Sequence, residues 1–263
     1  MIPARKSALF NAWFAGHARS RIHKTFGKVL VRGLEAARMT AERAPVVVVS
    51  NHTSWWDPLV VLHLSQHLLK TDGYALMDAK NLRRLPFFAL VGAFGVDLDQ
   101  PADGAAAIMF AARLLREPGK LVWIFPQGRE RPVTERPLGF KAGAAEIARV
   151  AKKAVSIPAA IRYEFNGEEK PHLYVSFGEA MSPERDVEKG REKQEMAVGQ
   201  ELDRLEQAVR GGAGGGAAVS GELECVHRAE PSWIGGVAER FLAMVTRPRI
   251  RQLAPGERPN DRP

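Results

Sequence analysis

A histidine and an aspartate five positions apart, His52 and Asp57, follow the apolar run at residues 46–49. A neutral imidazole can take a proton from an alcohol near pH 7, and it does so better when a carboxylate accepts a hydrogen bond from its other ring nitrogen. The pair therefore predicts a general base, His52, and a carboxylate that orients it. The competing interpretation is a turn in which Asp57 caps a helix that begins at Pro58.

A second stretch, residues 123–131, also holds residues that could take part in a reaction. It reads W-I-F-P-Q-G-R-E-R and includes the end of another apolar run. Glycine lets a ligand approach the backbone closely, so the N–H of Gly128 is a candidate donor to an oxyanion. Arg129 and Arg131 are candidates to hold a phosphate or a carboxylate, because guanidinium groups match both anions.

The segments that must position these side chains alternate between apolar runs and amphipathic stretches. This alternation predicts an α/β fold with a largely parallel sheet flanked by helices. Such sheets bind ligands at the carboxyl ends of their strands, where both stretches fall. The predicted strands are 46–49, 74–77, 94–98, 121–125, 157–165 and 173–177, and the predicted helices are 58–69, 105–116, 140–153 and 184–210.

The first 44 residues carry most of the net charge of +8, because they hold nine lysines and arginines against two glutamates, a balance of +7. Apolar and aromatic residues at helical spacing predict an amphipathic membrane-docking helix over residues 8–34. The alternative is a helix that packs its apolar side on the domain. No stretch reaches the roughly 18–20 apolar residues that span a bilayer, and no signal peptide is recognisable. We therefore expect a cytoplasmic protein, peripheral on the inner face of the cell membrane.

The single cysteine, Cys225, excludes an internal disulfide. The composition also changes along the chain, and these changes predict a division of the chain into four segments. Glycine-rich stretches are typical of flexible linkers, and helically spaced apolar residues at 233–245 predict a helix near the carboxyl terminus. The four parts are a basic helical segment at 1–44, the α/β domain at 45–210, a glycine-rich linker at 211–221 and a helical, basic tail at 222–263.

Four motifs occur in one order: N-H-x-S-x-x-D at 51–57, F-P-Q-G at 125–128, F-K-x-G at 140–143 and I-P at 157–158. This ordered set resembles the lysophosphatidate and glycerol-phosphate acyltransferase family. The resemblance implies direct transfer of a fatty acyl group from acyl-CoA or acyl carrier protein to a lipid hydroxyl in glycerophospholipid biosynthesis, without cofactor or metal. It also implies that His52 is the base, that Asp57 orients it, that residues 125–128 bind the acceptor head and the oxyanion, and that an N-terminal helical pair docks on the membrane.

Two positions depart from the family's motifs. Gln127 stands where the family has glutamate, which keeps the hydrogen-bonding shape, loses the charge and adds a donor. Leu98 stands where the family has an arginine that grips the acceptor's phosphate. Either Arg129, Arg131 or Lys141 takes over that contact, or the acceptor is a lipid alcohol without a phosphate, such as a glycosylated lipid.

Other functions fit parts of the sequence. A weakened relative that binds lipid as a scaffold would explain the two departures, but the retained His52 and Asp57 oppose it. Hydrolysis of the thioester by water is conceivable as a side activity. A nucleic-acid binder would use the basic N-terminus, yet no binding motif is recognisable, so no nucleic acid is expected. His63 and His67 have the spacing of a metal pair on one helix, but no further ligand accompanies them and no metal is expected.

Overall fold

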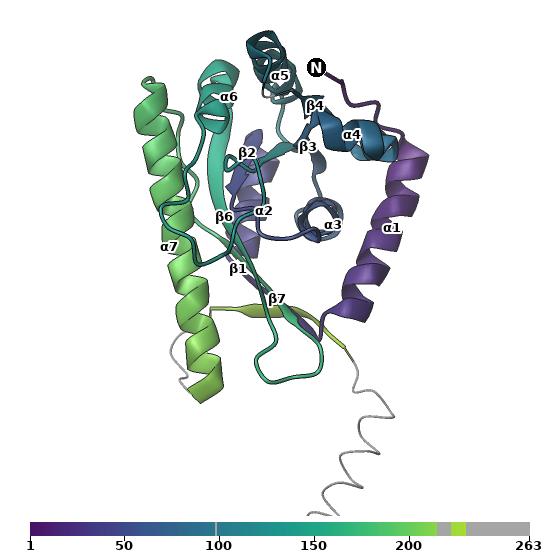
Figure 1. The fold of residues 1–263 in the computed structure, drawn as a ribbon, viewed down its shortest axis with the longest axis vertical. Helices are drawn as coiled ribbons and strands as arrows, with labels where there is room; N and C mark the ends of the chain where they lie inside the picture. The colour runs from purple at the N-terminus through teal and green to yellow at the C-terminus, as the bar shows by residue number, and fades with distance from the viewer. Residues whose placement is uncertain (98, 215–221, 230–263) are drawn as a thin grey trace, which may run out of the picture. The chain divides into compact units, whose positions relative to one another are not determined.

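The computed structural model of the protein describes residues 1–97, 99–214 and 222–229 (Figure 1). In chain order the elements are α1 Ala8–Thr25, β1 Lys28–Arg32, α2 Leu34–Arg43, β2 Val46–Ser50, α3 Asp57–His63, the π-helical turn η1 Leu64–Leu68, β3 Asp72–Asp78, α4 Ala79–Arg84, the 3-10 turn η2 Pro86–Val91, β4 Ala93–Val96, α5 Pro101–Leu114, β5 Lys120–Ile124, α6 Gly143–Ala151, β6 Val155–Glu164, β7 His172–Phe177, α7 Val187–Gly214 and β8 Glu224–Arg228.

The strands form one mixed sheet in the order β4-β3-β5-β2-β6-β7-β1-β8. The first five strands of that order are mutually parallel. β7 is antiparallel to β6, β1 is parallel to β7, and β8 is antiparallel to β1. The predicted α/β fold with a largely parallel sheet is confirmed.

Helices cover both faces of the sheet, which explains the consecutive apolar residues in β2 and β5. Val46 and Val48 belong to one core cluster, to which α1, α2 and α3 contribute. Val47 and Val49 belong to a second cluster, which is completed by α5, α6 and α7. In Figure 1, α6 and α7 lie on one side of the central strands and α1 and α3 on the other. A strand buried on both faces favours consecutive apolar residues, as the four valines at 46–49 of β2 show.

The predicted single helix over residues 8–34 is wrong in its last third. α1 ends at Thr25, and residues 28–32 form β1, which pairs with β7 and β8. Val29 and Val31 are buried while their neighbours are half-buried, which is the two-residue period of a strand. The apolar residues of this short segment also fit a helical spacing, so periodicity alone could not separate the two structures.

The carboxyl-terminal part also differs from the prediction where the structure describes it. α7 continues to Gly214, into the predicted linker at 211–221. Residues 224–228, predicted to belong to a helical tail, form β8 on the open edge of β1. Pairing of backbone groups with that edge does not depend on hydrophobic spacing, so it leaves little trace in the sequence. Leu98 and the predicted helix at 233–245 lie outside the described residues.

Candidate active site

Two parallel neighbours, β2 and β5, bring the first and second of the four motifs to the same edge of the sheet. β2 ends at Ser50 and β5 ends at Ile124, which pairs with Val49. The loops that carry His52 and residues 125–128 therefore leave the sheet side by side. This is the edge at which parallel α/β sheets bind ligands.

The side chains of His52 and Asp57 point toward each other, with Nδ1 of the imidazole 2.6 Å from Oδ2 of the carboxylate. The same oxygen accepts the backbone N–H groups of Thr53 at 2.9 Å and Ser54 at 3.1 Å. Asp57 is the first residue of α3, whose cap position is Trp56 and which has no side-chain capping bond. The carboxylate thus closes the loop back onto His52, and the interpretation of Asp57 as a helix cap is wrong.

Three further contacts fix the position of His52. Its backbone N–H donates to Oε1 of Gln127 at 2.7 Å, and its carbonyl oxygen accepts the backbone N–H of Arg131 at 2.8 Å. Its ring stacks on Phe125 with 4.6 Å between centroids. Because Asp57 engages Nδ1 and 21% of the side chain is exposed, Nε2 is the nitrogen left to meet a bound molecule. No hydrogen-bond partner of Nε2 occurs among the described residues, so it can accept a proton.

Gln127 and Gly128 are more firmly engaged than the sequence suggests. The Gln127 side chain is only 4% exposed, and its oxygen holds the His52 backbone. A glutamate would offer the same acceptor oxygen, so the departure from the family keeps this contact. Gly128 is exposed and has a φ of 71°, but its N–H donates to the carbonyl oxygen of Phe125 at 3.0 Å. The donor predicted for an oxyanion is therefore used within the turn.

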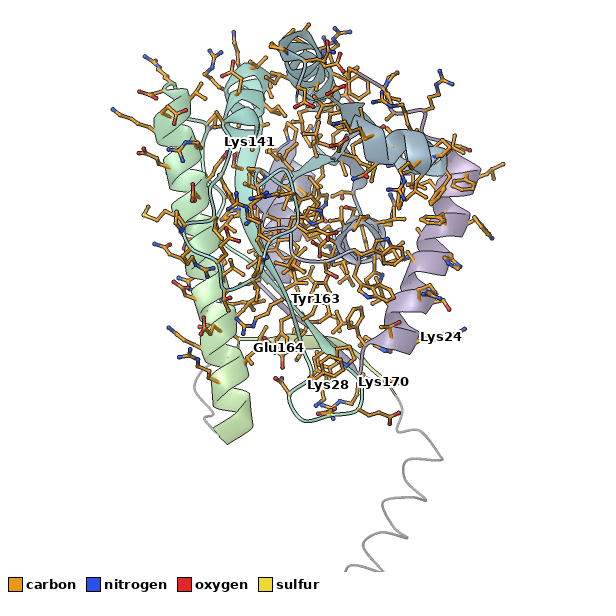
Figure 2. The ribbon with its side chains drawn as sticks, in the orientation of Figure 1. Lys24, Lys28, Lys141, Tyr163, Glu164 and Lys170 are labelled. Carbon is orange, nitrogen blue, oxygen red and sulfur yellow. The ribbon has the colours of Figure 1, made fainter. Side chains whose placement is uncertain are left out.

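The three predicted cationic side chains differ in their availability. Arg129 and Lys141 are exposed, and neither forms an ion pair within the described ranges. The backbone N–H of Lys141 donates to the carbonyl oxygen of Pro126 at 3.0 Å, which anchors residue 141 beside the F-P-Q-G motif, close to the start of α6 (Figure 2). Arg131 is half-buried and pairs with Glu135 at 2.6 Å. Arg129 and Lys141 are thus the cations that a ligand could reach without breaking an ion pair.

A third side chain, Tyr163 of β6, contacts the pair formed by His52 and Asp57. No sequence motif predicts this residue. Its hydroxyl donates to Oδ1 of Asp57 at 2.5 Å, although the two residues are 106 positions apart. Burial, together with the negative charge of Asp57, raises the pKa of Tyr163 well above its ordinary value. Asn51, part of the first motif, bonds the backbone N–H and C=O of Ile161 at 2.9 Å each, so it ties the end of β2 to β6.

The histidine pair on α3 and η1 has a structural explanation. His63 is buried beside His23 and His67, and His23 in turn stacks on His227. Burial and the neighbouring cationic groups lower the pKa of His63 to about 3 and that of His23 to about 4, so these imidazoles pack as neutral rings. In the part of the chain that the structure describes, no group of three or more histidine, cysteine or acidic side chains could hold a metal ion.

Comparison with models of known protein families shows to which family the chain belongs. The model of the family described as Acyltransferase matches residues 28–162, about half of the chain. The chain belongs to the acyltransferase family. The matched span of this lipid acyltransferase begins at β1 and ends within β6, so it contains His52, Asp57 and Gln127, and Tyr163 lies one residue beyond it. No curated protein sequence matches the chain.

Proposed function

We propose that this acyltransferase is a peripheral membrane enzyme that moves a fatty acyl group from acyl-CoA or acyl carrier protein to a hydroxyl of a lipid acceptor. The proposed acceptor is 1-acylglycerol-3-phosphate or a similar lipid, in glycerophospholipid biosynthesis. The observation that carries the proposal is the geometry of His52. Nδ1 is held at 2.6 Å by the fully buried Asp57, and 21% of the His52 side chain is exposed.

The chemistry follows from that geometry. Nε2 of His52 takes the proton of the acceptor hydroxyl as the oxygen attacks the carbonyl carbon of the thioester. A C–O bond forms, the tetrahedral intermediate collapses with cleavage of the C–S bond, and the leaving thiolate receives the proton from the imidazolium. Asp57 keeps the proton of the neutral ring on Nδ1 and stabilises the imidazolium that forms. The products are an ester and a free thiol, and His52 returns to its starting state.

For the acceptor's phosphate we propose Arg129 and Lys141, because both are exposed beside the F-P-Q-G motif. Arg131 would first have to release its acidic partner. Gly128 would reach an oxyanion only by exchanging its hydrogen bond to Phe125 for one to the substrate. A lipid alcohol without a phosphate is the second acceptor class, since the family's phosphate-gripping arginine is replaced by leucine in this sequence.

The outer surface of α1 supports contact with a membrane. Leu9 and Trp13 are 87% and 64% exposed, and Arg19, Arg21 and Lys24 are exposed on the same helix. Figure 2 shows Lys24 at the end of α1, on the side away from the sheet. Exposed apolar and aromatic side chains next to cations are typical of helices that lie in the lipid interface. None of the helices described in the structure is both long and apolar enough to pass through a bilayer.

An acceptor panel tests the proposed function. The full chain would be incubated with palmitoyl-CoA or palmitoyl-acyl carrier protein and with 1-oleoylglycerol-3-phosphate, a phosphate-free diglyceride or a glycosylated lipid, and the products identified by mass spectrometry. Acceptor-dependent release of thiol, together with the matching ester, is the expected result. A rate of thiol release that is the same with and without each acceptor would indicate a thioesterase. Binding to vesicles without any turnover would indicate a lipid-binding scaffold.

A further inference from the structure

We propose that Tyr163 is a positioning residue for the reaction, which holds the second oxygen of Asp57 and thereby sets how strongly that carboxylate binds the protonated form of His52. The inference rests on the proposed role of His52 as the base. It adds a third side chain to a pair that the sequence motif alone defines, and it assigns that side chain a measurable effect on the pH dependence of the reaction.

The hydrogen bonds of Asp57 divide between its two oxygens. Oδ2 accepts the ring N–H of His52 and the backbone N–H groups of Thr53 and Ser54. Oδ1 accepts the hydroxyl of Tyr163, and no other donor to it is found within the described part of the chain. Because the carboxylate is fully buried, such donors take the place of the water that would otherwise bind its oxygens. Tyr163 therefore supplies the hydrogen bond that the structure records for Oδ1 among the described residues.

The surrounding core keeps the Tyr163 ring in place. Tyr163 pairs with Leu173 across the β6–β7 hairpin, and Figure 2 shows it toward the end of β6. Its ring stacks on the buried Phe26 with 5.6 Å between centroids, and Phe26 in turn meets the edge of Trp56 at 5.3 Å. Since burial and the charge of Asp57 raise the pKa of Tyr163, its hydroxyl remains a donor throughout the neutral pH range.

A donor on Oδ1 draws negative charge away from Oδ2, the oxygen that faces His52. When that donor is removed, the carboxylate attracts the imidazolium more strongly, and the base remains protonated up to a higher pH. Fewer enzyme molecules then carry a neutral base on the acid side of the pH profile. The pH dependence of the reaction, rather than the rate at one pH, is the property that Tyr163 controls.

The test compares the pH–rate profiles of the wild type and Tyr163→Phe, with palmitoyl-CoA and 1-oleoylglycerol-3-phosphate in mixed vesicles. We expect the midpoint of the acid limb of kcat/KM to rise by about one pH unit, so that activity well below the wild-type midpoint falls by up to roughly tenfold and the two profiles converge at high pH. Tyr174→Phe is the matched control, since its hydroxyl bonds to Asn166 in the same hairpin and not to Asp57. An unchanged midpoint in Tyr163→Phe, whatever its maximal rate, overturns the proposal.

Two further measurements keep the test independent of folding and of the proposed function. Replacing Tyr163 by 3-fluorotyrosine strengthens the donor without removing it, and should move the same midpoint to lower pH. The pH titration of the His52 ring protons by NMR, identified by their loss in His52→Ala, should follow both shifts without any substrate. If His52→Ala keeps full activity, the proposed role of His52 as the base fails, whereas the titration still decides whether Tyr163 acts on the carboxylate that binds His52. A titration that neither substitution moves refutes that role.

Discussion

Gln127 offers a direct test of whether a residue of the second motif supports His52 or binds the acceptor. Its oxygen accepts the His52 backbone N–H at 2.7 Å, and its side chain is 4% exposed. Gln127→Leu keeps the approximate volume and removes the acceptor, which leaves a poorly solvated N–H without a partner. The cost of such a group is about 1–3 kcal/mol of folding free energy. Displacement of His52 should also lower kcat by roughly tenfold, because geometry at the base controls proton transfer.

Gln127→Glu is the matched variant, because it restores an acceptor oxygen at the same position. It should keep kcat within a few-fold of the wild type. Steady-state kinetics with varied 1-oleoylglycerol-3-phosphate, and urea unfolding of the same preparations, measure both effects. If Gln127→Leu raised KM for the acceptor while kcat and stability stayed at wild-type values, Gln127 would be an acceptor-binding residue and the support of His52 described above would be refuted.

Three further outcomes follow from the site and its surroundings. Asp57→Asn should lower kcat about 10³–10⁴-fold with little change in KM, because an amide cannot stabilise the imidazolium; retention of a tenth of the wild-type kcat would contradict this role. Lys141→Ala should raise KM about tenfold for 1-oleoylglycerol-3-phosphate and leave KM for a phosphate-free acceptor unchanged, and an equal rise for both would exclude phosphate binding. The lowered pKa of His63, about 3 against about 6.5 in the unfolded chain, means that unfolding takes up a proton below pH 6.5. Stability should therefore fall by about 2 kcal/mol between pH 7 and pH 5 through this group, and urea unfolding of His63→Leu should lack that part of the fall.

The centre of the fold could be predicted from the sequence because its strands are buried on both faces. Such strands need uninterrupted apolar runs, as in residues 46–49 and 121–125, and those runs stand out against the helices between them. The edge of the sheet formed by β1 and β8 could not be predicted in this way. β1 is a five-residue strand whose apolar spacing also fits a helix, and β8 is defined by backbone pairing with β1.

The site divides in the same way between local and distant contacts. His52 and Asp57 lie within one tight loop, so their spacing carries the information that they meet. The contact between Tyr163 and Asp57 joins residues 106 positions apart and exists only because β6 lies beside β2 in the sheet. The burial of Gln127 is likewise a property of the packed structure, whereas the sequence shows only its hydrogen-bonding groups.

The measurement that tests the central claim most directly is acceptor-dependent release of thiol by His52→Ala. The assay would use palmitoyl-CoA with the best acceptor of the panel, and His17→Ala, which removes an exposed imidazole on α1, would serve as the control. We expect His52→Ala to lose at least about 10³-fold in kcat while its folding and its binding to vesicles stay unchanged, and His17→Ala to stay near the wild-type rate. Transfer of the acyl group at the full rate by His52→Ala would show that another group takes the proton from the acceptor.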